Sequence, residues 1–296
     1  MTSADALPCI EVRGLRKRFG ATVAVDGVDL TVDQGRILGL IGPNGAGKST
    51  ALNAILGLIP HEGDVKVLGR DPWREHDALM REVCFIADVA VLPRWLRVEQ
   101  ALDYLAGVHP RFDRAKAEAF LSRTAIGLTS KVRQLSKGMV TQLHLALVMA
   151  IDARLLVLDE PTLGLDILYR KQLYDALLND YFDGSRTIIV TTHQVEEIQH
   201  VITDLAFIDR GRIVLRCSMD DFERRYAEVL VHPAHAAAAQ ALKPIYERQV
   251  FGRSLLLFDS VDRERLAALG EVRTPSIADL FIAVVGGHAP AGAASA

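Results

Sequence analysis

The sequence predicts an α/β protein with a smaller α+β part towards its C-terminal end. Three observations carry this prediction. Short apolar runs alternate with helical segments, which is typical of α/β sheets. A glycine-rich loop joins a strand to a helix at residues 42–50, and the composition shifts near Cys217. We therefore expect a large unit over residues 8–216, a small α+β unit over 217–286 and a flexible tail over 287–296.

The expected elements of the large unit follow from apolar spacing. Residues 155–158 and 187–191 are apolar without alternation, as in buried parallel strands. Between residues 98 and 126, apolar residues recur at intervals of three and four residues, which favours a helix in two pieces broken at Pro110. In chain order, we expect strands at 9–12, 28–32, 36–41, 84–86, 155–158 and 187–191, a basic turn at 16–20, and helices at 48–58, 98–126 and 138–151.

The small unit reads as a mixture of strands and helices. Strands are expected at 227–232 and 254–258, and helices at 233–242, 263–269 and 276–285. The first of these helices is rich in alanine, a strong helix former.

Composition excludes several classes of protein. The 296 residues carry 34 Lys and Arg against 37 Asp and Glu, a net charge of −3, which argues against binding to nucleic acid through overall positive charge. Cys9, Cys84 and Cys217 form no CxxC pair, so we expect neither a disulfide framework nor a cysteine metal site. The N-terminus lacks the apolar core of a signal peptide. No stretch approaches the ~20 apolar residues of a membrane span, so work at a membrane would require a partner.

The glycine-rich loop has the pattern G-x4-G-K-[ST] between a strand and a helix, the context in which that pattern binds phosphate. Glycines let successive backbone N–H groups converge on a polyphosphate, and the helix N-terminus adds partial positive charge. Lys48 is expected to reach the β- and γ-phosphates, and the Ser49 hydroxyl to ligate Mg²⁺. The alternative is a glycine turn that binds nothing. The loop consists of Gly42, Pro43, Asn44, Gly45, Ala46, Gly47, Lys48, Ser49 and Thr50.

Two carboxylates end the apolar strand at 155–158. Buried charges need partners, and Mg²⁺ held by a phosphate would supply one. We expect Asp159 to hold the metal through water and Glu160 to polarise the attacking water beside the γ-phosphate. The alternative is an acidic pair that faces solvent.

Three further motifs complete a recognisable order. They are QLSKGM at residues 134–139, PTLGLD at 161–166 and TTH at 191–193. From about Val12 to Val214 the chain resembles the ATP-binding cassette (ABC) ATPases. The resemblance implies a P-loop nucleoside triphosphatase fold, with a RecA-like core, an antiparallel β subdomain and a helical subdomain at about residues 90–150.

The resemblance also implies roles for single residues. Ser136 and Gly138 would bind the γ-phosphate of ATP held by a second copy, in a head-to-tail dimer. His193 would be the switch histidine that contacts the γ-phosphate, Asp166 would cross the dimer, and Phe19 would stack on adenine. Taken alone, each has a plainer interpretation as a helix cap, a structural histidine, a loop residue or core packing.

The chain departs from the family pattern at several positions. Asp88 stands where the family has Gln or Glu; it could still ligate Mg²⁺ and belongs with Glu160, His193 and Lys48 among the candidate catalytic residues. Its alternative is a loop aspartate near solvent. Lys137 and Met139 replace the usual Gly and Gln, and LSKGM is similar to a variant common in ATPase subunits of ABC-2 type exporters.

Two segments indicate a membrane partner. Leu92 and Trp95 lie where the family forms a groove for a short helix of the membrane subunit, although a satellite core cluster is the alternative. Residues 274–281 look like a C-terminal element of ABC-2 type exporter subunits. We therefore expect an ATP-hydrolysing transporter subunit, most consistent with an exporter, on the cytoplasmic face of the cell membrane.

The expected cofactors are ATP and Mg²⁺. The expected partners are a second copy or a paralogous cassette and an integral membrane subunit, with no nucleic acid. The competing functions are a cassette ATPase without a transport role and a regulatory module that senses ATP without turnover.

Overall fold

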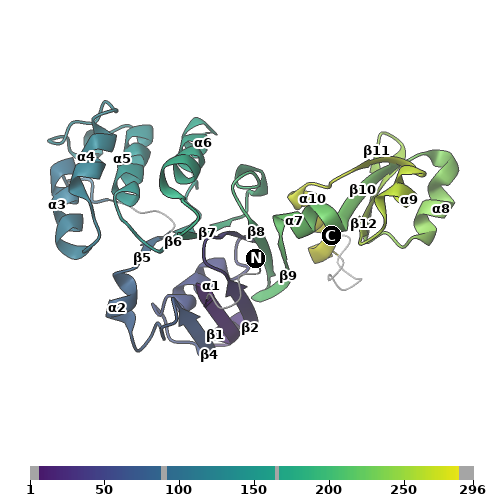
Figure 1. The fold of residues 1–296 in the computed structure, drawn as a ribbon, viewed down its shortest axis with the longest axis horizontal. Helices are drawn as coiled ribbons and strands as arrows, with labels where there is room; N and C mark the ends of the chain where they lie inside the picture. Colours follow the sequence, from purple (N-terminus) through teal and green to yellow (C-terminus); the bar gives the residue numbers. More distant parts are fainter. Residues whose placement is uncertain (1–6, 88–91, 164–166, 287–296) are drawn as a thin grey trace.

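The computed structural model describes residues 7–87, 92–163 and 167–286. Figure 1 shows four groups of elements: a central sheet, a small antiparallel sheet, a group of helices and a C-terminal sheet with its own helices. Within the described ranges, none of the helices has both the length and the apolar character that crossing a bilayer requires. Asp88, Asp166 and the predicted tail at 287–296 lie outside the described residues.

The six-stranded central sheet positions the candidate site. Its order is β5-β6-β7-β3-β8-β9; the first five run parallel and β9 pairs antiparallel to β8. Every residue of β3, β6 and β7 is buried, so their sequences are apolar without alternation. The α/β prediction is confirmed, and the four predicted strands of this sheet are found within one residue of their expected bounds. The strands are β3 (Ile37–Ile41), β5 (Val83–Ile86), β6 (Leu155–Asp159), β7 (Thr187–Thr192), β8 (Asp204–Asp209) and β9 (Arg212–Ser218).

The antiparallel sheet has the order β2-β1-β4, formed by β1 (Ile10–Phe19), β2 (Thr22–Val32) and β4 (Glu62–Val67). The basic turn predicted at 16–20 is wrong, because β1 continues to Phe19 and the chain turns at Gly20 and Ala21. An antiparallel strand can keep one face in water, so the charged residues of β1 fit within it. Arg16, for example, pairs in register with Asp26 of β2, with 3.7 Å between Nε and Oδ1.

The helices of the large unit follow the predicted order with shorter ends. The break at Pro110 is confirmed, but the second piece ends at Leu121 rather than Ile126. The first helix ends at Ile55 rather than Leu58, and Gly57 then takes the left-handed φ of 68°. Helices α3, α4 and α5 pack around a core of their own, seen as a separate group in Figure 1. The helices are α1 (Lys48–Ile55), α2 (His76–Met80), α3 (Val98–Val108), α4 (Arg114–Leu121), η1 (Val132–Gln134), α5 (Lys137–Met149), α6 (Ile167–Ala176), η2 (Leu177–Tyr181) and η3 (Val195–Glu197).

The C-terminal part is a four-stranded antiparallel sheet of order β11-β12-β10-β13 with helices around it. The two predicted strands and three predicted helices are present, the Ala-rich segment as a 3-10 turn followed by a short α-helix. Two strands, β11 and β13, and helix α7 are additional. The elements are α7 (Met219–Arg225), β10 (Tyr226–Val231), η4 (Pro233–His235), α8 (Ala236–Ala241), β11 (Tyr246–Val250), β12 (Arg253–Asp259), α9 (Arg263–Ala267), β13 (Gly270–Arg273) and α10 (Ile277–Gly286).

The last helix, α10, joins the C-terminal part to the central sheet. Ile277 and Leu280 are buried in the same hydrophobic cluster as Leu205 and Phe207 of β8. The ring of Phe281 packs edge-on against Phe207, with 5.1 Å between centroids. The two sheets therefore share one hydrophobic core through this helix.

This contact predicts a large effect of shortening Phe281. Phe281→Ala should lower the free energy of unfolding by about 3 kcal/mol, because it removes an aromatic ring from the shared core. Ile282→Ala, on the same helix, is the matched control: Ile282 is 49% exposed and its loss should cost less than about 0.5 kcal/mol. Denaturant unfolding of both variants measures the difference. Equal destabilisation would show that α10 does not depend on the Phe207 contact.

Candidate nucleotide-binding site

The glycine-rich loop lies between β3 and α1, as predicted. Gly45 and Gly47 have left-handed φ values of 81° and 103°, which L side chains rarely adopt. A Cβ on Gly47 would lie 2.4 Å from the carbonyl oxygen of Ala24, and one on Gly42 would lie 2.3 Å from that of Ile208. Glycine is therefore required at 42 and 47 by the close approach of neighbouring backbone.

Backbone hydrogen bonds hold the loop from two sides. The N–H of Gly42 donates to the carbonyl of Thr192 at the end of β7, at 3.3 Å. The carbonyl of Ala46 accepts from the N–H of Gly211, in the turn between β8 and β9, at 2.8 Å. Gly211 in turn accepts from Asp26 of β2 at 2.9 Å. Pro43, Asn44, Gly45 and Ser49 remain exposed, and Thr50 is half-buried.

Lys48 opens α1 and lies buried under the loop. Its Nζ donates to the carbonyls of Gly42 and Pro43, at 2.7 and 3.2 Å. The same Nζ lies 3.0 Å from Oε1 of Glu160, and the two side chains are 5% and 10% exposed. This is a buried ion pair between the loop and the end of β6.

The ends of β6 and β7 hold the two predicted carboxylates. Asp159 and Thr191 are paired in register, and the Thr191 hydroxyl donates to Oδ1 of Asp159 at 2.5 Å. The N–H of Glu160 donates to the same hydroxyl oxygen at 3.0 Å. Glu160 has a left-handed φ of 47°, which is uncommon for a residue with a side chain and turns it away from the strand direction.

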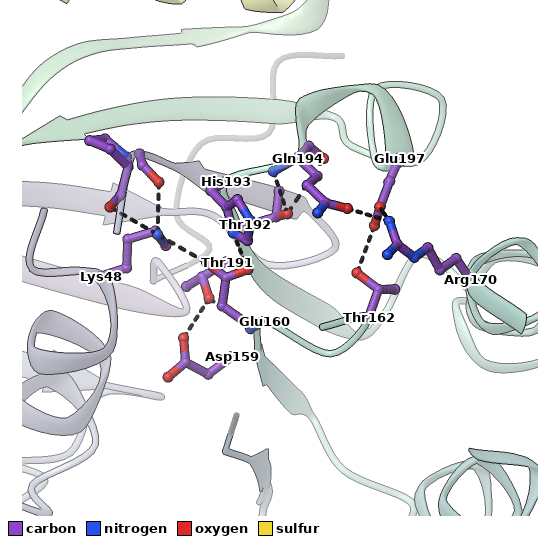
Figure 2. A network of polar contacts seen from close by, with 12 residues as sticks. Lys48, Asp159, Glu160, Thr162, Arg170, Thr191, Thr192, His193, Gln194 and Glu197 are labelled. Atoms are coloured by element: carbon purple, nitrogen blue, oxygen red, sulfur yellow. Dashed lines mark hydrogen bonds and ion pairs between the residues drawn. The ribbon is translucent and has the colours of Figure 1, made fainter. Parts of the chain in front are cut away.

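His193 completes a row of three charged or titratable side chains. Its Nδ1 lies 2.9 Å from Oε2 of Glu160, whose other oxygen faces Lys48. Figure 2 shows the row running from Lys48 through Glu160 to His193, with Asp159 below it. The structure thus brings together four of the predicted residues, from the glycine-rich loop and from two neighbouring strands.

Other predicted residues lie elsewhere in the chain. Ser136 caps α5, its Oγ accepting from the N–H of Met139 at 3.2 Å, and Gly138 is buried in the first turn. Figure 1 shows α5 in the helical group, apart from α1. Phe19 ends β1 and is 54% exposed, with Nζ of Lys17 5.0 Å from its ring centroid. Within one chain, then, Ser136 and Gly138 lie in a different group of elements from the glycine-rich loop.

Sequence reasoning placed Thr191 in the TTH motif but gave it no role. This residue bonds both to Asp159 and to the backbone of Glu160, so it fixes the two carboxylates. One signal was available in the sequence. Thr191 lies in a run expected to be a buried strand, and a buried hydroxyl needs a hydrogen-bond partner, which the acidic end of the other buried strand could provide.

These features define a class of protein. A phosphate-binding loop between a parallel strand and a helix, with an Asp–Glu pair ending another strand of the same sheet, is the arrangement of a P-loop nucleoside triphosphatase.

Comparison with known proteins gives the family. The family model described as "ABC transporter" matches residues 25–163. The chain is 33% identical over 247 residues to the daunorubicin resistance ATP-binding protein DrrA3 of Streptomyces coeruleorubidus, covering 80% of this chain and 78% of that protein. It is 36% identical over 234 residues to the sulfate/thiosulfate import ATP-binding protein CysA of Bradyrhizobium diazoefficiens, covering 75% and 67%.

Solved structures agree. The "Structure of ATP binding subunit of ABC transporter" superimposes with a TM-score of 0.64 at 26% identity, covering 73% of this chain and 92% of that one. The protein belongs to the ABC transporter family and is an ATP-binding subunit, an ATPase coupled to transport. Members of this family bind ATP, and such subunits partner with membrane subunits.

The close approach at Gly47 generates a prediction. Gly47→Ala should weaken ATP binding at least tenfold, about 1.4 kcal/mol, because the new Cβ collides with the Ala24 carbonyl and displaces the loop. Gly69→Ala is the matched control: φ there is 78°, but nothing lies within 4 Å of the new Cβ. The control should lose about 1 kcal/mol of stability and keep its ATP affinity. Calorimetric titration measures the ATP affinity of both variants. Unchanged affinity in Gly47→Ala would show that a Cβ at this position does not displace the loop.

Proposed function

We propose that this protein hydrolyses ATP at the row Lys48–Glu160–His193 and that the resulting opening and closing of a dimer drives an exporter. The row is the observation that carries the proposal. It places one cation, one carboxylate and one imidazole at the edge of the loop. We assign residues 8–216 to the ATP-binding unit and 217–286 to an appended unit.

The loop supplies the binding site for the triphosphate. Its left-handed glycines turn backbone N–H groups towards one point, and α1 begins there with its partial positive charge. Lys48 lies at the inner side of the loop and contacts the β- and γ-phosphates in this proposal. Exposed Phe19 offers a ring face for adenine, since aromatic rings stack on bases.

The donor set fits Mg²⁺ delivered with ATP. Magnesium in proteins is held by one or two carboxylates together with phosphate oxygens and water. Asp159 and Ser49 provide that limited set, and Asp88 is a further candidate outside the described residues. In the described ranges, no three His, Cys, Asp or Glu side chains gather into a metal site of their own. When bound, Mg²⁺ would neutralise charge that develops on the phosphates.

Glu160 is the proposed general base. Its carboxylate is held from both sides, by Lys48 and by His193, and its backbone is fixed by Thr191. A carboxylate fixed beside the γ-phosphate accepts a proton from water and orients that water for attack. Asp159 and Glu160 are both buried, which argues against the alternative of an acidic pair that faces solvent. His193 in turn keeps Glu160 aligned and contacts the γ-phosphate.

A second copy would complete the site. Ser136 and Gly138 begin α5 and lie away from the loop of their own chain, so they would reach the γ-phosphate of a partner's ATP, with Asp166 crossing between the copies. The segment after Thr162 presents apolar side chains to solvent: Leu163 is 48% and Ile167 84% exposed. Apolar surface of this kind favours a protein contact.

An apolar groove provides a place for the membrane subunit. It has a volume of about 720 Å³ and lies against α3 and α5. Trp95 and Tyr104 flank it at 69% and 68% exposure, as aromatic anchors do at interfaces. His144 also lines the groove; its Nε2 is buried without a hydrogen-bond partner, and burial lowers the pKa of this ring. We propose that a short helix of an integral membrane protein binds here and holds the chain at the cytoplasmic face.

The names of the similar proteins favour export over import. The match to DrrA3 covers more of both chains than the match to CysA, and the chain is also 33% identical over 211 residues to the daunorubicin/doxorubicin resistance protein DrrA of Streptomyces peucetius. The C-terminal element at 274–281, which contributes to α10, and the LSKGM motif at 135–139 both resemble exporter subunits. We therefore propose an exporter.

Replacement of the general base gives the first test. Glu160→Gln should still bind ATP and lose at least 100-fold in kcat, because the amide cannot accept the proton. Without turnover, the closed dimer should accumulate with ATP and Mg²⁺, which light scattering would detect. Normal turnover would remove Glu160 from its role. A wild-type chain that stays monomeric with a non-hydrolysable ATP analogue, Mg²⁺ and its membrane partner would refute the shared site.

The groove gives a second test. The double variant Trp95→Ala and Tyr104→Ala should lose about 1,000-fold in affinity for the membrane subunit, since central aromatic anchors are each worth about 2 kcal/mol and each 1.4 kcal/mol is tenfold. Trp73→Ala serves as control, because Trp73 is 57% exposed on another part of the surface. Co-purification from membranes, followed by titration of the captured subunit, compares the variants. Equal capture of the membrane subunit by both variants would show that it does not bind in this groove.

A further inference from the structure

A second group of polar contacts lies one step beyond the catalytic row. The hydroxyl of Thr162 donates to Oε2 of Glu197 at 2.6 Å. The guanidinium of Arg170 pairs with the other oxygen of Glu197 and also donates to the side-chain oxygen of Gln194. Figure 2 shows these four side chains meeting beside His193.

The four residues come from the segments that carry Glu160 and His193. Thr162 follows Glu160 by two positions, and Gln194 directly follows His193. Glu197 ends the short helix η3 in the same loop, and Arg170 lies in the first turn of α6. The Thr162–Glu197 bond thus adds to the Glu160–His193 contact between the segments that follow β6 and β7.

Burial makes this second connection stiff. Thr162 is 3% exposed, and the side chains of Glu197 and Arg170 are 14% and 24% exposed. A hydrogen bond to an ionised carboxylate is about twice as strong as a neutral one, and partial burial reduces screening by salt. The neighbouring Gln194 is anchored as well, because its N–H donates to the hydroxyl of Thr192 at 2.9 Å.

We propose that Arg170 and Glu197 form a clamp that sets the position of His193 relative to Glu160. Arg170 holds Glu197 and Gln194 together, and Glu197 holds Thr162, so the loop after β7 cannot shift without breaking a charged contact. We assign both as positioning residues, because the contacts described above join them to Thr162 and Gln194. The proposal rests on the roles proposed above for Glu160 and His193. It assigns the clamp to the hydrolytic step and leaves ATP binding to the loop.

The test separates positioning from general structural support. Glu197→Gln keeps the shape of the side chain and removes its charge. Its kcat should fall about tenfold, while KM for ATP stays within about twofold. Glu82→Gln is the matched control, because Glu82 is also 14% exposed and ion-paired, to Arg154 at 3.0 Å, but lies at the opposite end of the central sheet. Its kcat should stay within about twofold of wild type.

A second background tests the route through His193. In a His193→Ala chain, adding Glu197→Gln should cause no further loss of kcat, because the residue that the clamp positions is absent. The same tenfold loss in both backgrounds would overturn the proposal, as would an unchanged kcat in folded Glu197→Gln. If His193→Ala itself leaves kcat unchanged, the proposed role of His193 fails and the clamp with it. If kcat falls in His193→Ala but not in Glu197→Gln, the clamp proposal is overturned and the proposed role of His193 stands.

A further pair of variants covers poor folding of Glu197→Gln. Thr162→Val removes the hydroxyl and keeps the shape, and Thr162→Ser restores the donor. The clamp predicts that kcat falls in Thr162→Val and recovers in Thr162→Ser, with thermal unfolding recorded for both. Equal kcat values in the two folded variants would overturn it.

Discussion

The buried contact between Lys48 and Glu160 constrains the rest of the site. Both side chains are at least nine-tenths buried, and an ionised group at that depth needs partners that remain in place. Lys48 uses two carbonyls of the glycine-rich loop, and Glu160 uses His193 as its second partner. Removing one member would leave the other charge uncompensated, at a cost of about 3–5 kcal/mol. The loop and the ends of β6 and β7 must therefore meet at fixed separations, which the parallel sheet provides.

Much of this could be predicted from the sequence, because the determining signals are local. The parallel strands are apolar runs without alternation, and the loop at 42–50 has glycines where neighbouring backbone leaves no room for a Cβ. The acidic end of β6 follows from two carboxylates after a buried run. Such features depend on a few adjacent residues, so they can be interpreted from the sequence without the three-dimensional structure.

What could not be predicted depends on contacts between distant segments. The charged run at the end of β1 reads as a turn until its partners in β2 are known. Strands β4, β11 and β13 are short and largely exposed, so they carry weak apolar patterns. Thr191 and Glu197 look ordinary in sequence and gain their roles from Asp159 and Arg170, each more than 25 residues away. Roles of this kind arise from packing.

The turn at Gly211 has a mechanical consequence. It braces the glycine-rich loop at one end of β9, and the other end of β9 leads directly into α7 and the C-terminal sheet. The seven residues of β9 span about 23 Å as a hydrogen-bonded strand. A shift of the loop on nucleotide binding would therefore tilt a rigid strand rather than pull on a slack linker. The C-terminal sheet would then rotate about the contact between Phe281 and Phe207.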